Sequence, residues 1–480
     1  MSNLAKNSAL YLVSTVVLKA TSFLLLPLYS NLIPPEAYGK VYLVSSYVTF
    51  FSIFMTFSMQ GAMQRFFFDC KSDNEIKELY STIVIFVFGI SSVTAALLLV
   101  FNNTIAGWMN LPPVYLLLAT ATVYLSAFYN LILALLYAQQ QAVTISVVSI
   151  VCGVLSILTQ LTLVLTMQDK AFALVLTMLV GGVMHFALFL WFSRKYLVLK
   201  FNRIKLKSSV YYGLSQFPSD ISTFIVSLSD RFILNKYKNS GAVGIYGMGN
   251  TLGTIPQVLF SSMNSALAPI IFTNYTDRKE GKVPDISYSC SLIEKVSILL
   301  TIIITLLIVF SNNIVAILSD KYQQSGFVMF LVLFAVLIDI YRKLFMYPIA
   351  YEVKYVKVKS AIWILASALS IGLNLILIPK YSYYGACVSL ICANSLTLGL
   401  ILIASNKAMH PKYKVGKLAL ILTLSIICSM SFFLGFSWGM IPVKMVIVAV
   451  YLVFVYMIYP IDYKEMFSFI KFKRKLLVMR

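Results

Sequence analysis

The sequence predicts an all-α membrane protein that crosses the bilayer about 14 times, with two six-helix lobes and two additional C-terminal helices. Its 480 residues are 60% hydrophobic and only 11% charged, and the mean hydropathy is +0.87. A soluble chain of this length does not have such a composition. Apolar segments of about 20 residues or more, the length that spans a bilayer as a helix, follow one another along the chain.

Charged or turn-forming residues bound fourteen such segments. Their expected ranges are 8–32, 39–63, 80–101, 112–138, 143–167, 171–193, 211–235, 241–272, 291–318, 325–347, 357–378, 384–406, 415–437 and 441–460. The first segment is expected to be an uncleaved span, because no small-residue cleavage site follows a short apolar core and Lys19 interrupts the apolar run.

Lysine and arginine residues indicate the topology. With the N-terminus inside, 29 of the 38 basic residues fall on the inner side and 8 on the outer side, and Lys19 lies within the first span. Because cytoplasmic loops are enriched in basic residues, both termini and the loop at 194–210 are expected in the cytoplasm. Asn103 and Lys321 are expected on the periplasmic side. This topology accounts for most of the net charge of +21, so nucleic acid is not an expected partner.

Two pairs of short segments indicate an internal repeat. SMQGAMQRFFF at 58–68 is similar to SMNSALAPIIF at 262–272, and LLVFNNTIA at 98–106 is similar to LIVFSNNIV at 307–315. Six helices make up the repeat, so the two copies have the same orientation. They are expected to be related by an axis along the membrane normal, with a substrate site between them.

The repeat divides the chain into three parts. Residues 1–207 are expected to form an N-lobe of six spans, and residues 208–410 a C-lobe of six spans. Residues 411–480 add a helix pair and a basic cytoplasmic tail.

The predicted site is centred on Lys19. It lies about 16 Å along the helix from Ser8, and a charge at that depth costs at least about 2.5–3.5 kcal/mol. Polar side chains at helical spacing share its face: Ser8, Tyr11, Thr15, Ser22 and Tyr29. The favoured interpretation is a lysine that faces a wet cavity and receives an anion. The alternative is a lysine satisfied by neighbouring helices for packing.

A second polar face lies in the seventh span. It contains Gln216, Asp220, Thr223, Ser227 and Asp230 at helical spacing, and the repeat offset carries Lys19 onto Thr223. We expect the two faces to line one cavity. The candidate substrate-binding residues are Lys19, Arg65, Gln60, Thr15, Ser22, Asp220, Thr223 and Asn264.

Other charges at membrane depth are candidates for coupling or gating. They are Asp230, Arg231, Asp339, Arg342 and Lys343. A simple structural role is the alternative for both groups: Asp339 would pair with Arg342 or Lys343 at i, i+3 or i, i+4 spacing, and Asp230 with Arg231 would form an interfacial pair. His185, the lone histidine within a span, fits a satisfied core position better than a proton relay.

The residues predict no catalytic centre, metal site or cofactor. The six cysteines show no metal-binding spacing, and no Gly-Lys pair is followed by Ser or Thr as a nucleotide-binding loop requires. A membrane glycan polymerase or glycosyltransferase would need paired acids on a sizeable outer loop, and the outer loops are short.

Several stretches resemble polysaccharide flippases of the MOP superfamily, the Wzx-type exporters of lipid-linked O-antigen or capsule repeat units. They are NSALYLVSTVVLKATSFLLLPLYSNLIPPEAYG, QGAMQRFFF, SLSDRFILNKYKNSGAVGIYGMGN and LNLILIPKYSYYGACVSL. The resemblance implies two six-helix lobes with alternating access, a cationic central cavity and an undecaprenyl-diphosphate-linked oligosaccharide as cargo. It also implies the bacterial inner membrane, with a glycan polymerase and a chain-length regulator as partners.

The chain departs from two related branches. Lipid II flippases have several arginines in the first two spans, where only Lys19 and Arg65 stand here. Cation-coupled multidrug exporters use an N-lobe acid, whereas none of the six expected N-lobe spans of this chain contains Asp or Glu. Because a nucleotide site is also absent, the expected driving force is an ion gradient, the membrane potential or consumption of the glycan outside.

Overall fold

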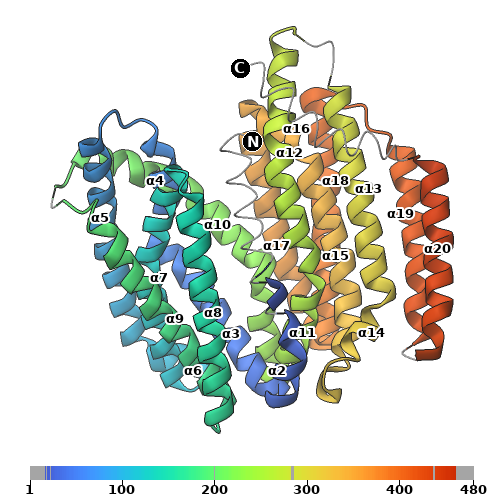
Figure 1. Ribbon diagram of the computed structural model, residues 1–480, viewed down its shortest axis with the longest axis horizontal. Helices are drawn as coiled ribbons and strands as arrows, with labels where there is room; N and C mark the ends of the chain where they lie inside the picture. Colours follow the sequence, from blue (N-terminus) through green and yellow to red (C-terminus); the bar gives the residue numbers. More distant parts are fainter. Residues whose placement is uncertain are drawn as a thin grey trace. The chain divides into compact units, whose positions relative to one another are not determined.

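The structure is a computed structural model that describes residues 17, 19–21, 23–198, 200–282, 286–435 and 438–460. Every regular element in these ranges is a helix (Figure 1). The predicted all-α class is therefore confirmed. By chain contacts the structure divides into two compact units: a first unit of Ala9–Gly247 with Ser367–Ala386, and a second unit of Met248–Ala366 with the chain from Cys387 onward.

The first unit is built around α7. Its helices are α2 (Leu26–Leu32), α3 (Pro35–Thr56), α4 (Met59–Phe67), α5 (Asp73–Val100), α6 (Asn102–Met109), α7 (Pro113–Ala138), α8 (Ala142–Thr166), α9 (Lys170–Ser193), α10 (Arg203–Tyr237) and the start of α11 (Ser240–Gly253). Helix α7 packs against α3, α4, α5 and α9, and α8 packs on α9 (Figure 1).

Polar side chains fix where several of these helices begin. Ser72 caps α5 by accepting a hydrogen bond from the Glu75 amide, and Asn202 caps α10. Asp169 caps α9. Partial burial alone would raise the pKa of the Asp169 carboxyl, but hydrogen bonds from the Phe172 and Ala171 amides and the Tyr115 hydroxyl hold that pKa below its usual value.

Helices α3 and α11 approach each other at their glycines. A Cβ on Gly39 would overlap the Ser240 carbonyl, and a Cβ on Gly244 would overlap the Pro35 carbonyl. Gly247 lies against the ring of Tyr42. Small residues let helix backbones come this close within a membrane.

This contact gives the first prediction. Gly244→Ala should lower the stability of the protein by about 2–3 kcal/mol, because the new methyl group meets the α3 backbone. The matched control is Gly107→Ala, where the added Cβ meets nothing within 4 Å. Protein level in the membrane and thermal unfolding in detergent measure both variants. If Gly244→Ala were as stable as Gly107→Ala, the close approach would be wrong.

The second unit contains the remaining helices. They are α12 (Ile255–Lys279), α13 (Ser287–Val309), α14 (Ser311–Val315), η1 (Asp320–Tyr322), α15 (Ser325–Phe345), α16 (Tyr347–Tyr351), η2 (Val353–Tyr355), α17 (Val356–Tyr381), α18 (Tyr383–Met409), α19 (Val415–Ser429), η3 (Met430–Leu434), η4 (Trp438–Met440) and α20 (Ile441–Ile458). The part of α17 from Ser367 and the first residues of α18 belong to the first unit. Helix α13 packs against α12, α15 and α19.

The C-terminal helices α19 and α20 are fixed to α13 and α14 by buried polar contacts. The Thr305 hydroxyl on α13 and the Ser425 hydroxyl on α19 form a hydrogen bond with each other. Lys444 is fully buried, and its Nζ donates to Asn313 Oδ1 at 2.9 Å and to the Gly435 carbonyl at 3.1 Å. A buried ammonium needs such acceptors, so the helix pair is an integral part of this unit.

Within the described residues, nine helices are long and apolar enough to cross a membrane, or up to eleven when two bent helix pairs each count as one span. The count of fourteen is therefore not confirmed. Among the described residues, the expected segments from 39 onward are mostly helical, but 39–63, 241–272, 291–318 and 415–437 each contain two helices. Much of 8–32 falls outside the described residues. Helices α10 and α15, both expected spans, are not among the nine; both carry buried charges.

The second pair of repeat segments has matching local structure. Helix α5 ends at Phe101 with φ −92° and ψ 9°, and the short helix α6 follows. Helix α13 ends at Phe310 with φ −97° and ψ 7°, and the short helix α14 follows. The first pair differs, because Ser58 lies at a helix break and Ser262 lies inside α12. The lobe boundaries at 207 and 410 stay a prediction.

Candidate functional site

Lys19 is helical and exposed on the first unit. It forms no ion pair with any other described residue. Thr223 is also exposed, and its hydroxyl donates only to the Ser219 carbonyl of its own helix. Thr15 and Ser22 lie outside the described residues. The anion-binding role of Lys19 therefore stays a prediction.

Arg65 already has a local partner. Its Nη1 lies 2.9 Å from Asp69 Oδ1, and both side chains are about half exposed. An exposed pair of this kind contributes little to stability. Arg65 can therefore exchange Asp69 for another anion.

A helix break between α3 and α4 positions Asp220. Phe57 and Ser58 have φ of 48° and 55°, values that non-glycine residues rarely adopt, and the two helices are bent by 50°. The Ser58 hydroxyl donates to Asp220 Oδ2 at 2.6 Å. Gly213 lets α10 approach this break, since a Cβ there would lie 2.6 Å from the Phe57 carbonyl oxygen. Asp220, which lies on α10, thus stabilises the break between α3 and α4 through this hydrogen bond.

Two further candidates have different surroundings. Gln60, in the first turn of α4, has a buried Oε1 with no hydrogen-bond partner among the described residues. Asn264, on α12 in the second unit, accepts a 2.6 Å hydrogen bond from the Tyr347 hydroxyl. The amide of Asn264 is therefore already oriented by the protein.

Asp339, Arg342 and Lys343 form an ionic triad on α15, in which Asp339 and Arg342 are buried. Asp339 uses both carboxylate oxygens: Oδ1 accepts from Arg342, and Oδ2 lies 2.7 Å from Lys343 Nζ. Their side chains are 8%, 6% and 35% exposed, in that order. The i, i+3 and i, i+4 ion pairs expected from helical spacing are present, and the triad keeps one net positive charge.

Other helices of the second unit hold the triad in place. The Arg342 guanidinium stacks over the Trp363 ring at 4.4 Å and donates weakly to Thr397 Oγ1 at 3.5 Å. Its Nε is buried and has no hydrogen-bond partner in the part of the chain that the structure describes. Sequence reasoning missed Trp363 and Thr397, because their proximity to Arg342 arises only in the folded chain.

Asp230 and Arg231 are both buried in the first unit, with 4% and 8% of their surface exposed. Asp230 Oδ2 accepts from the Tyr246 hydroxyl. Arg231 lies over the Tyr42 ring at 5.2 Å and reaches Ser46 Oγ at 3.3 Å. Tyr246 thus contacts Asp230, and Tyr42 contacts Arg231.

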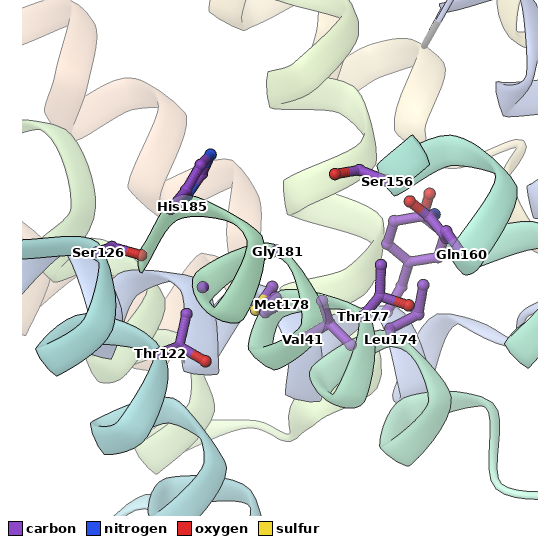
Figure 2. Close-up of a pocket in the computed structure, with 12 residues that line it drawn as sticks. Val41, Thr122, Ser126, Ser156, Gln160, Leu174, Thr177, Met178, Gly181 and His185 are labelled. Carbon is purple, nitrogen blue, oxygen red and sulfur yellow. The ribbon is translucent and has the colours of Figure 1, made fainter. Parts of the chain in front are cut away.

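The first unit also contains a pocket of about 370 Å³ (Figure 2). Helices α3, α7, α8 and α9 surround it, and no charged side chain is among its lining residues: Tyr38, Val41, Thr122, Ser126, Ser156, Gln160, Leu174, Thr177, Met178, Gly181, Gly182 and His185. Of these residues, the sequence alone draws attention only to His185. The described residues hold no cluster of three or more His, Cys, Asp or Glu side chains that could bind a metal.

More than half of the chain matches a known protein family. Residues 4–275 match the model of a family described as "Polysaccharide biosynthesis protein". The chain belongs to this family. This polysaccharide biosynthesis protein is also similar to an "Uncharacterized membrane protein" of Haemophilus influenzae. The two are 24% identical over 287 residues, and the alignment covers 58% of this chain and 67% of the relative.

Solved structures show the fold of the polysaccharide biosynthesis protein. The lipid II flippase MurJ in an inward closed conformation aligns with a TM-score of 0.71 at 13% identity, over 93% of this chain and 98% of that one. An inward-facing multidrug resistance MATE family transporter of the MOP superfamily aligns with a TM-score of 0.63 at 12% identity, over 82% and 97%. The protein is thus a multi-pass membrane protein with a MOP-type fold.

Proposed function

We propose that this polysaccharide biosynthesis protein is a flippase for lipid-linked oligosaccharides. It moves undecaprenyl-diphosphate-linked repeat units of O-antigen, capsule or lipopolysaccharide from the cytoplasmic to the periplasmic leaflet of a bacterial inner membrane. The membership of the polysaccharide biosynthesis family and the MOP-type fold support this function. The observation that carries it is Lys19, a cation exposed within an apolar helix and without an acidic partner among the described residues.

The diphosphate is the part of the cargo that Lys19 binds. Lysine binds phosphate as a point charge, and arginine binds it as a fork. Lys19 pairs with the diphosphate in the membrane, and Arg65 is a first contact at the cytoplasmic end of α4. The remaining contacts are polar side chains: Thr15, Ser22, Gln60, Asp220, Thr223 and Asn264. The lipid tail stays in the bilayer during transport.

Alternating access of the N-lobe and C-lobe completes the cycle. Asp230 and Arg231 in one unit, and the α15 triad in the other, are the coupling or gating groups of this mechanism. Both termini are cytoplasmic, and a glycan polymerase and a chain-length regulator take over the cargo outside.

Depletion of the protein from its host tests this function. Lipid-linked repeat units should accumulate in the inner leaflet, and surface polysaccharide should fall by roughly tenfold or more, while cells remain viable. Expression of the chain from a plasmid is the control and should restore display. Cell death with accumulated lipid II would assign the protein to peptidoglycan synthesis instead. Normal polysaccharide with increased retention of cationic dyes would indicate drug export.

A further inference from the structure

We propose that the pocket between α3, α7, α8 and α9 receives a neutral sugar residue of the cargo. This inference rests on the proposed flippase function and assigns a second subsite to it, separate from the charged residues that bind the diphosphate. The pocket volume of about 370 Å³ falls within the range of small-molecule sites. All twelve lining residues belong to the first unit, so this unit forms the pocket by itself.

Four polar side chains of the pocket form no hydrogen bond to other described residues. The Ser126 and Ser156 hydroxyls, the Gln160 amide and the His185 imidazole line the cavity, and none of them forms a hydrogen bond with the rest of the chain that the structure describes. Figure 2 shows Ser126 and His185 on one side of the pocket and Ser156 and Gln160 on the other. These side chains can donate and accept hydrogen bonds, so the arrangement favours a ligand that can hydrogen bond on two sides.

The chemistry of the lining favours a sugar over an ion. A cation would need a carboxylate, and a phosphate would need lysine or arginine, but the lining contains neither. Hydroxyl, amide and imidazole groups both donate and accept hydrogen bonds, as sugar hydroxyls do. Tyr38 and His185 add ring surfaces, and His185 is held by stacking on Tyr129 at 4.4 Å with nearly parallel rings.

Gly181 provides a way to fill the pocket without disturbing the fold. A Cβ at Gly181 would meet nothing within 4 Å, although this residue lines the pocket. The neighbouring Gly182 is different, because a Cβ there would lie 3.2 Å from the Thr122 Cα. A side chain added at Gly181 therefore enters the space that a ligand would use.

The test compares Gly181→Leu with Gly89→Leu. Gly89 is exposed on α5, where a Cβ also meets nothing within 4 Å. Gly181→Leu should reduce surface polysaccharide at least roughly tenfold at a normal protein level, and Gly89→Leu should leave it unchanged. Gln160→Leu should reduce display in the same direction, because it removes hydrogen bonds without filling the pocket.

A cross-linking experiment identifies the occupant. Photoreactive benzoylphenylalanine replaces Met178 in the pocket or, as a control, the exposed Leu165 on α8. After irradiation of cells that display polysaccharide, only the pocket position should carry a mass that contains sugar residues.

Three results would overturn the subsite. They are equal display by Gly181→Leu and Gly89→Leu, no sugar adduct at position 178, or an adduct there to an acyl chain or to residues 1–16. Failure of the flippase function itself gives a different result, because the unmodified chain would then not restore polysaccharide to depleted cells. The two hypotheses are therefore distinguishable in the same strain.

Discussion

Lys19→Ala is expected to abolish surface polysaccharide while the protein remains inserted and abundant. A charged hydrogen bond to phosphate contributes about 1.5–3 kcal/mol, so its loss should slow transport by roughly 10- to 100-fold. Lys19 is exposed and has no ion-pair partner among the described residues, and its removal leaves no buried charge behind. The structure therefore gives no reason for Lys19→Ala to unfold.

Two further variants separate charge from packing. Lys19→Arg should retain much of the function, because it keeps the charge although the geometry changes. Lys19→Glu should be no better than alanine, since it would repel the diphosphate. If Lys19 serves packing, alanine should be tolerated, and arginine should be tolerated no better than alanine. Glycan display and protein level are measured together in all three variants, and near-normal display by Lys19→Ala would contradict the cavity role.

Helix positions were predictable because they depend on local sequence. Most of the described residues in the apolar runs from 39 to 460 are helical, and charged or turn residues mark the ends of these runs. The break at Phe57 and Ser58 was not predictable from glycine or proline, since neither occurs there. It depends on α10, where Gly213 permits the approach and Asp220 accepts from Ser58.

The candidate site also combines features that the sequence predicts with features that it does not. Pairing of Asp339 with Arg342 and Lys343 follows from helical spacing and was foreseen. Trp363 and Thr397, which contact Arg342, come from other helices, and no local pattern indicates this. The pocket is likewise formed by four helices. Gln160 and the Gly181–Gly182 pair, a polar residue and two small ones within apolar spans, were the signals that could have identified it.

The α15 triad should show the largest loss of stability. Asp339→Asn removes the carboxylate that both cations share and leaves the Arg342 guanidinium buried without a counter-charge. Breaking a buried pair from one side typically costs about 3–5 kcal/mol. We therefore expect low protein levels and a clearly reduced thermal transition in detergent. Lys343→Met is the matched control, and it should cost only about 1 kcal/mol, because Lys343 is about one-third exposed and Asp339 keeps Arg342.

A double variant distinguishes a structural triad from a coupling one. Asp339→Leu combined with Arg342→Met removes both buried charges, and apolar replacement of a buried pair is often neutral for stability. The double variant should therefore be more stable than Asp339→Asn. If the triad couples lobe movement to an ion, this stable variant should still fail to display polysaccharide; normal display would show that the triad only supports the fold. Equal stability of Asp339→Asn and Lys343→Met would instead contradict the buried pairing, because an uncompensated guanidinium cannot be tolerated as easily as a missing, partly exposed ammonium.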